Sequence, residues 1–200
     1  QRLKTRKSRA FIKKVAIIVV VVVVVAALVT VYTLGGGNKP ATTETAGKVL
    51  LVTSMGNITI ELYSDMPTTT GNFKNLTSQG IYDGTIFHRV VHNFVVQGGD
   101  PTGTGQGDPS IPPIQDEFSA NPDHNRNDRG TVAIANAGPN TGSSQFFINL
   151  VNNNHLDNKH PVFGRVIAGM DVVDAIGNVQ TDQNDRPLQE VKLIKALLIG

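Results

Sequence analysis

Residues 87–100 read FHRVVHNFVVQGGD, and this stretch decides how the rest of the sequence is interpreted. Two apolar runs, each about as long as a strand, flank a short turn and predict a β-hairpin. Arg89 lies inside the first run and Gln97 inside the second. A polar group inside an apolar strand is costly unless it lies at an edge or serves binding. These two residues are therefore the first candidates for a site.

Strand patterns recur after residue 48 and are separated by turn residues. Eight strands are predicted, at 48–53, 57–63, 85–91, 94–99, 130–136, 144–151, 161–167 and 190–199. Two short helices are predicted, one at 65–80 and one at 169–177, and Asp65 is the predicted N-cap of the first. Many strands with few helices favour an all-β barrel or sandwich. The long stretch between residues 100 and 130 is rich in Gly, Pro, Asp and Asn, and we expect it to be an ordered excursion over the domain surface.

The charge is distributed unevenly along the chain. Residues 1–14 carry seven of the 18 basic residues and none of the 16 acidic ones, so the remainder has a net charge of −5 although the whole chain has +2. We interpret residues 1–14 as a basic cytoplasmic tail. A mildly acidic domain argues against nucleic-acid binding, which normally requires a basic face.

Residues 15–34 read VAIIVVVVVVVAALVTVYTL and carry no charge. A helix of this length spans about 30 Å, the thickness of the hydrocarbon core, so the segment is predicted to be a transmembrane anchor. A cleaved signal peptide is the alternative, but its apolar region is shorter and ends in a small-residue cleavage motif, which TVYTLGGG lacks. The preceding basic cluster places the N-terminus in the cytoplasm. Residues 35–47 are predicted to be a flexible linker, and residues 48–200 an extracytoplasmic domain. The chain would thus cross the cell membrane once.

Several kinds of chemistry are disfavoured by the residues present. The chain has no cysteine, which excludes disulfides and thiol catalysis. GTGQG at 103–107 lacks the Lys-Ser/Thr of a phosphate loop, and either a flexible loop or positive backbone φ angles explain its glycines. The histidines lack metal-ligand spacing, and Ser143 is not in a G-x-S-x-G elbow. No metal or other cofactor is predicted. Asn57 and Asn75 begin glycosylation sequons whose use the sequence leaves open.

The remaining polar residues lie beside aromatic and aliphatic ones, as at a small-ligand or peptide site. FHRVVHNFVVQGGD, ANAGPNTGSSQFFINL and HLDNKHPVFGRVIAGMDVVDAI, in this order, resemble the signature blocks of the cyclophilins, the cyclosporin-type peptidyl-prolyl cis-trans isomerases. The resemblance covers residues 48–200. It implies an eight-stranded antiparallel barrel with two capping helices and a groove on the outer surface. We expect the domain to be monomeric.

The resemblance also implies roles for single residues. Arg89 would be the catalytic arginine, and the substrate-binding residues would be Phe94, Val95, Gln97, Ala135, Asn136, Gln145, Phe147, His155, Leu156 and His160. Many family members have methionine in place of Val95, and cyclosporin-sensitive members have tryptophan in place of His155, so tight binding of that drug is not expected. Strand parity places Phe94 at the beginning of a strand or beside a bend, since it cannot share a face with Val95 and Gln97.

The expected function is isomerisation of X-Pro peptide bonds, which assists the folding of extracytoplasmic proteins. The partners would be proline-containing peptides and unfolded or folding proteins, together with the membrane. The alternative is a proline-peptide-binding holdase or scaffold module in which turnover is incidental. Rotation about the peptide bond is opposed by a barrier of about 18–20 kcal/mol and needs neither a nucleophile nor a redox group. A positioned guanidinium can stabilise the twisted state, and this favours the enzyme over the binding module.

Overall fold

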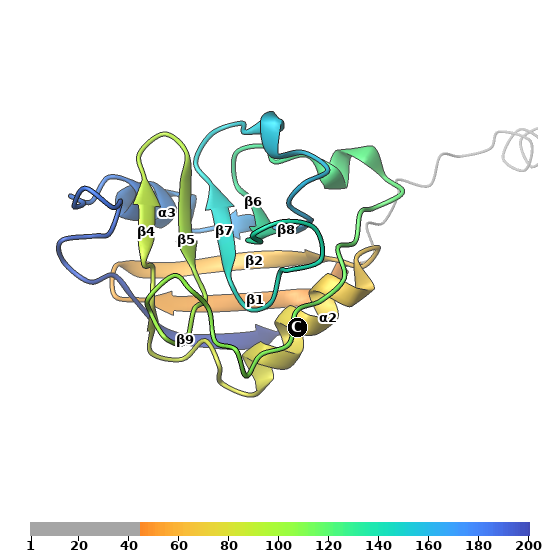
Figure 1. Cartoon of the computed structure of the whole chain (residues 1–200), viewed down its shortest axis with the longest axis horizontal. Coiled ribbons are helices and arrows are strands. Elements are labelled where there is room, and N and C mark those ends of the chain that lie inside the picture. The colour runs from red at the N-terminus through yellow and green to blue at the C-terminus, as the bar shows by residue number, and fades with distance from the viewer. Residues whose placement is uncertain (1–44) are drawn as a thin grey trace, which may run out of the picture. The chain divides into compact units, whose positions relative to one another are not determined.

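The computed structural model describes residues 45–200, which fold as a mainly-β domain (Figure 1). The predicted basic tail 1–14, the predicted membrane anchor 15–34 and most of the predicted linker 35–47 lie outside these residues. Within residues 45–200, no helix is both long enough and apolar enough to cross a membrane. The first strand begins at Thr45, a little before the predicted start of the domain at Lys48.

Nine strands form one antiparallel sheet within this range, in the spatial order β3-β9-β1-β2-β8-β6-β7-β5-β4. In chain order they are β1 (Thr45–Thr53), β2 (Gly56–Tyr63), β3 (Thr85–Ile86), β4 (Arg89–Val91), β5 (Val95–Gly98), β6 (Thr131–Ile134), β7 (Phe146–Asn149), β8 (Val162–Ala168) and β9 (Lys192–Ile199). The two edge strands, β3 and β4, are separated by only two residues of the chain. The sheet must therefore curl until its edges lie close together.

The prediction of a single strand over residues 85–91 was wrong. The segment is divided at Phe87 and His88 into β3 and β4, and this division gives nine strands rather than eight. The reason is a change of partner, because β3 pairs with β9 whereas β4 pairs with β5. Between them, the backbone N–H of Phe87 donates to the carbonyl of Val191. The structure is therefore a curled sheet of nine strands, whose edge strands β3 and β4 are connected by residues 87–88, and not the expected eight-stranded barrel.

Two α-helices within residues 45–200 accompany the sheet: α2 (Pro67–Ser78) and α3 (Met170–Gly177). The prediction that Asp65 caps the first helix was wrong, because the N-cap is Met66 and its side chain makes no capping bond. The carboxylate of Glu117, from the long excursion, instead accepts from the N–H groups of Thr68 at 3.2 Å and Thr69 at 2.9 Å. A carboxylate at this position also complements the positive end of the helix dipole.

The core fills the inner face of the curled sheet. Phe73 of α2 contacts three aromatic rings, with centroid distances of 5.0 Å to Tyr82, 5.4 Å to Phe146 and 4.9 Å to Phe163. All four side chains are fully buried. Burial of aromatic rings is a large favourable contribution to folding, and edge-to-face pairs add to it. The inner face is thus apolar, so polar groups on the strands point to the outer face.

The long excursion between β5 and β6 is ordered along its length and is held to the domain by side chains. Ser119 and His124 donate to the carboxylate of Asp65, and the His124 ring stacks on Tyr63 at 3.9 Å between centroids. A short 3-10 helix, η1 (Pro122–Asn125), begins after Asn121. These contacts explain why Asp65 does not cap α2: its oxygens accept hydrogen bonds from the excursion.

Candidate active site

The register of four strands places the central site residues in one row. Arg89 on β4 lies opposite Gln97 on β5, Gln97 lies opposite Phe147 on β7, and Phe147 lies opposite Ala133 on β6. Residues directly opposite in antiparallel strands point to the same side of the sheet. The arginine, the glutamine and the phenylalanine therefore point together to the outer face, although Phe147 is far from the other two in sequence.

A pocket of about 190 Å³ opens beside this row. Nine of the eleven predicted site residues line it: Arg89, Phe94, Val95, Gln97, Ala135, Asn136, Phe147, Leu156 and His160. Gln145 lines a neighbouring pocket of about 240 Å³, which shares Gln97, Ala135 and Asn136 with the first. The structure thus brings ten predicted residues to two adjoining hollows on one surface. His155 lines neither and lies at the rim, where its ring stacks on Phe94 at 5.8 Å.

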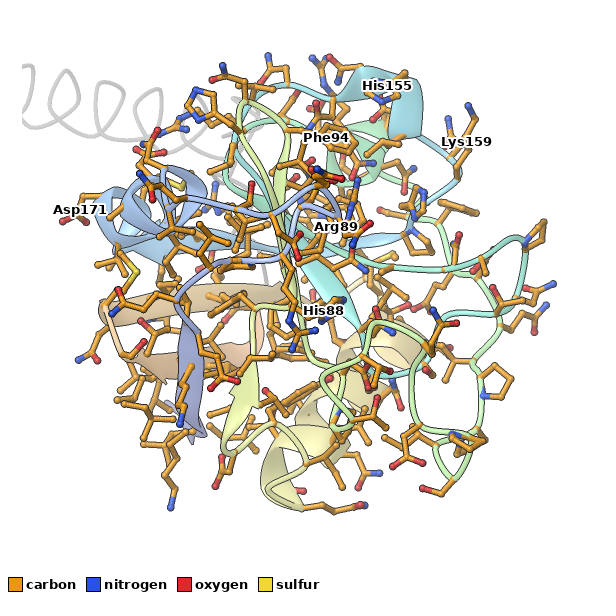
Figure 2. All side chains as sticks on the ribbon, turned by 60° about the vertical axis from the view of Figure 1, so that its left-hand side comes forward. His88, Arg89, Phe94, His155, Lys159 and Asp171 are labelled. Carbon is orange, nitrogen blue, oxygen red and sulfur yellow. The ribbon has the colours of Figure 1, made fainter. Side chains whose placement is uncertain are left out.

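Arg89 lies at the mouth of the first pocket, below Phe94 and His155 in Figure 2. Its Nη1 donates to Oε1 of Gln97 at 3.4 Å, and its Nε lies 3.5 Å from Oδ2 of Asp185. The guanidinium carbon lies 5.9 Å from the centre of the Phe94 ring. With 39% of its side chain exposed, the guanidinium keeps donors available for a ligand. Sequence reasoning missed Asp185, which belongs to a loop before β9 and carries no motif.

A chain of amide side chains continues from Arg89 along the groove. Nε2 of Gln97 donates to Oε1 of Gln145 at 2.9 Å, and Nε2 of Gln145 donates to the carbonyl of Gly105 at 3.1 Å. Because each amide is held by the next, both present a fixed orientation to whatever occupies the groove. The chain therefore connects Arg89 to the glycine-rich loop at 103–107.

The loop at 100–107 is organised by one carboxylate. Asp100 is buried, and its two oxygens accept from the N–H groups of Thr102, Gly105 and Gly107. Burial alone would raise the pKa of Asp100, but these hydrogen bonds outweigh it and lower the pKa. The expected positive φ angles are present at Gly103, Gly105 and Gly107. The loop forms a wall of the second pocket, a role that its sequence did not indicate.

The apolar floor of the first pocket joins two parts of the chain. Val95 and Phe147 are buried, and Phe94 directly precedes β5, as strand parity required, after Asn93 at a positive φ of 56°. Leu156 comes from η2 (Asn154–Leu156), a 3-10 helix that was not predicted. A small apolar ring, such as that of proline, suits a pocket of this volume.

His160 closes one side of the pocket in a neutral form. Its ring packs edge-on against Phe147 at 5.4 Å, and Nδ1 lies 3.3 Å from the carbonyl of Ile134. A carbonyl can only accept, so Nδ1 carries the proton and Nε2 is left as an acceptor. Burial lowers the pKa of His160, which keeps the ring neutral at pH 7.

Buried asparagines behind the pocket hold its two sides together. Nδ2 of Asn153 donates to the carbonyl of Phe94 at 3.0 Å and to Oδ1 of Asn149 at 2.8 Å. Nδ2 of Asn149 continues to Oγ1 of Thr131 at 3.0 Å. Sequence reasoning missed this network, whose signal was the asparagine-rich run NLVNNN at 149–154. Asn136 adds a tie at the rim, because its Nδ2 donates to the carbonyl of Lys159 at 2.8 Å.

His88 follows directly below Arg89 in Figure 2, and its side chain is buried. Neither ring nitrogen has a hydrogen-bond partner among the residues described. Burial lowers the pKa of His88, so the ring is neutral at pH 7. An added Cβ at Gly105 would lie 3.3 Å from the His88 ring, so the imidazole supports the glycine-rich loop from below.

Most of the chain matches known proteins. Residues 48–197 match the family model described as cyclophilin type peptidyl-prolyl cis-trans isomerase/CLD. The chain is 48% identical over 153 residues to the peptidyl-prolyl cis-trans isomerase CYP18-2 of Arabidopsis thaliana, covering 76% of this chain and 93% of that protein. It is 49% identical over 152 residues to the isomerase ppi1 of Schizosaccharomyces pombe, covering 76% and 98% of the two chains.

The fold has matching solved structures. A cyclophilin-type isomerase of Cryptosporidium parvum superposes with a TM-score of 0.71 at 31% identity, covering 77% of this chain and 98% of that one. A second structure of that protein, determined in the presence of the dipeptide Ala-Pro, gives a TM-score of 0.71 at 32% identity, covering 76% and 99%. The curled sheet and its two helices therefore form a fold already seen in such proteins.

Proposed function

Because the chain belongs to the cyclophilin-type peptidyl-prolyl cis-trans isomerases, we propose that its activity resides in the groove beside Arg89, with the substrate proline in the pocket of about 190 Å³. Isomerisation of X-Pro peptide bonds is the activity of the family and of this chain. The observation that supports this assignment is that one pocket contains both the Arg89 guanidinium and an apolar floor, which is formed by Phe94, Val95, Phe147 and Leu156.

The reaction requires rotation about a bond with partial double-bond character. In the twisted transition state the imide nitrogen loses its conjugation with the carbonyl and becomes a hydrogen-bond acceptor. Arg89 donates to this nitrogen and to the proline carbonyl, which are both within reach of a planar group with several donors. In the planar ground states the nitrogen lone pair is delocalised into the carbonyl and accepts poorly, so this donation stabilises the transition state selectively.

The other groove residues hold the substrate so that only the bond of interest rotates. The pocket floor takes the proline ring, while Gln97, Gln145 and Asn136 present fixed amide groups to the flanking backbone. Nε2 of His160 offers an acceptor at the side of the pocket. Each 1.36 kcal/mol of selective stabilisation gives a tenfold rate increase, so a few such contacts account for a large acceleration.

The test of the site compares the full-length wild type with Arg89→Ala on an Ala-Pro peptide, followed by NMR exchange between the cis and trans forms. Loss of one preorganised donor typically lowers the rate by about 10²- to 10³-fold. We expect a loss of this size with peptide binding largely retained. Arg126→Ala is the control, since Arg126 lies on the long excursion and pairs with Asp128. An Arg89→Ala protein as active as the wild type would show that the chemistry lies elsewhere.

The cellular role proposed for this isomerase is to assist folding on the outer side of a membrane. Residues 15–34, uncharged and preceded by seven basic residues, support an anchor with the domain of residues 48–200 outside the cytoplasm. An isomerase needs no ATP, which suits an extracytoplasmic compartment. Protease treatment of intact cells tests this arrangement: a membrane-bound chain whose domain is cleaved only after lysis would contradict it.

A further inference from the structure

β9 is apolar on both of its faces, although one face is open to solvent in the part of the chain that the structure describes. Leu193 and Ala196 are buried against the core, whereas Leu197 is 37% exposed and Ile199 is 36% exposed. Strands that are apolar on both faces are typical of positions covered on both sides. The outward side of β9 therefore has the composition of a contact surface.

The strand register extends this surface onto β1, the strand by which the chain enters the domain. Residues directly opposite each other in an antiparallel pair point to the same side. Three such pairs define the surface, which we name the β9–β1 face: Ile199 with Lys48, Leu197 with Leu50, and Lys195 with Val52. Four apolar side chains are thus contiguous, and a lysine lies at either end.

The two lysines distinguish between possible occupants of the β9–β1 face. A second copy docked symmetrically would bring lysines of both copies to one interface, where like charges oppose association. A lipid surface accepts the same pattern, because lysine stems lie along apolar groups while their ammonium groups reach phosphates. Nζ of Lys195 lies 4.0 Å from Oδ2 of Asp83, at the outer limit of an ion pair. Lys48 forms no ion pair with any residue between 45 and 200.

The position of β1 in the chain supports a lipid surface. Only residues 35–44 separate the uncharged segment 15–34 from Thr45, the first residue of β1. Ten residues span at most about 35 Å when fully extended, so an anchored domain stays close to the bilayer and meets it at a high effective concentration.

We propose that the β9–β1 face rests on the headgroup region of the membrane. The inference depends on the proposed anchor at residues 15–34. It adds an orientation to that anchor. In the strand order, β2, β8, β6 and β7 lie between β1 of this face and β5 of the groove. β9 lies low in both views, whereas Phe94 and His155 lie at the top of Figure 2. The proline groove then faces away from the bilayer, toward its substrates.

The absence of tryptophan from the sequence allows a direct test with the full-length chain. The Leu197→Trp variant is reconstituted into phosphatidylcholine–phosphatidylglycerol vesicles, with and without brominated acyl chains. We expect bromine to quench at least about half of the emission, since the indole would lie at the interface. Lys159→Trp is the control on the groove side, and its emission should be unaffected. In the Leu197→Trp background, changing Lys48 and Lys195 to Glu should reduce the quenching about twofold, whereas Lys159→Glu should not.

Flotation of the vesicles after carbonate treatment separates the two ideas. A chain that does not float contradicts the anchor and the orientation together. A chain that floats while Trp at position 197 stays unquenched overturns the orientation alone. Emission that is shifted to the blue but unaffected by bromine also overturns it, because the face would then be covered by protein, either a second copy or residues 15–34.

Discussion

Nε of Arg89 lies 3.5 Å from Oδ2 of Asp185, so the guanidinium is held from a loop outside the hairpin that carries it. The backbone N–H of Val90 donates a hydrogen bond to the carbonyl of Asp185 in the same loop. Arg89 is thus fixed on one side by Gln97 and on the other by Asp185. The arginine is positioned by contacts that leave part of it open to the groove.

Replacement of Asp185 should lower activity modestly. An ion pair exposed to this degree contributes about 1 kcal/mol or less, which corresponds to roughly a two- to fivefold loss in kcat/KM for Asp185→Asn. Asparagine tolerates the positive φ of 61° at this position, so the fold should be retained. Asp171→Asn on α3 is the control, and peptide isomerisation by NMR is the measurement. An unchanged rate would mean that Asp185 does not orient the arginine.

The amide chain predicts coupled effects at Gln97 and Gln145. Either single change to leucine should lower kcat/KM about tenfold, since the remaining amide loses a partner in a half-buried site. The double variant should lose less than the product of the two single losses, because the contact between the side chains can be removed only once. A double-mutant cycle on the Ala-Pro peptide measures this coupling. Strictly multiplicative losses would show that the two amides act independently.

A tryptophan at position 155 should strengthen cyclosporin binding. His155 stacks on Phe94 at the rim but does not line the pocket, so an indole there would extend the apolar surface next to bound ligand. We expect at least about tenfold tighter binding for His155→Trp, measured by calorimetry, with peptide isomerisation within about threefold of the wild type. His155→Leu is the control for loss of the imidazole alone. Equal cyclosporin affinity in all three proteins would contradict the expectation.

Asp65 should make stability depend on pH at the acidic end. Burial would raise its pKa, but hydrogen bonds from Ser119 and His124 outweigh this and lower it. A carboxyl whose pKa is lowered by folding stabilises the protein above its unfolded pKa of about 3.9, and this stabilisation is lost as the pH falls through the folded pKa. At pH 7, Asp65→Asn should cost about 1 kcal/mol or less, because the group is partly exposed.

Chemical denaturation of Asp65→Asn and wild type between pH 2 and pH 7 measures the difference. The two stabilities should converge below about pH 3, when the wild-type carboxyl is protonated as well. A constant difference across the range would mean that the hydrogen bonds, rather than the charge, account for the effect of the substitution.

Two glycines should respond to alanine in opposite directions. Gly99 has a φ of +80°, and an added Cβ would lie 2.7 Å from both the Ser144 carbonyl and the Phe146 ring, so Gly99→Ala should be strongly destabilising, by roughly 2 kcal/mol or more. Gly71 lies on the exposed side of α2, and apart from its chain neighbours and the backbone of its own helix no atom lies within 4 Å of such a Cβ. Gly71→Ala should stabilise by about 0.5–1 kcal/mol, through the better helix propensity of alanine. Thermal unfolding of both variants distinguishes strain from propensity.

Much of the domain was predictable because its signals are local. Seven of the eight predicted strands are present with shifted ends, since alternation of side chains depends only on neighbouring residues. The site residues were identified by resemblance to a family, and the structure brings ten of the eleven to adjoining pockets. The membrane anchor at 15–34 stays a prediction, because it lies outside the described residues.

The errors and omissions share a physical cause. The break at Phe87 and His88 exists because β3 and β4 pair with different strands. Asp65 does not cap α2 because its carboxylate accepts hydrogen bonds from Ser119 and His124, which belong to a distant segment. Periodicity within one segment contains no information about such partners.

By itself, the sequence determined which segments alternate between apolar and polar residues, where the glycines permit turns, and that a basic tail and an uncharged run precede an acidic domain. Only the tertiary structure decided the register that aligns Arg89, Gln97 and Phe147, and the loop contact from Asp185 that holds the arginine. The physical reason is that strand periodicity is set by covalent neighbours, whereas register is set by the packing of all strands around one core.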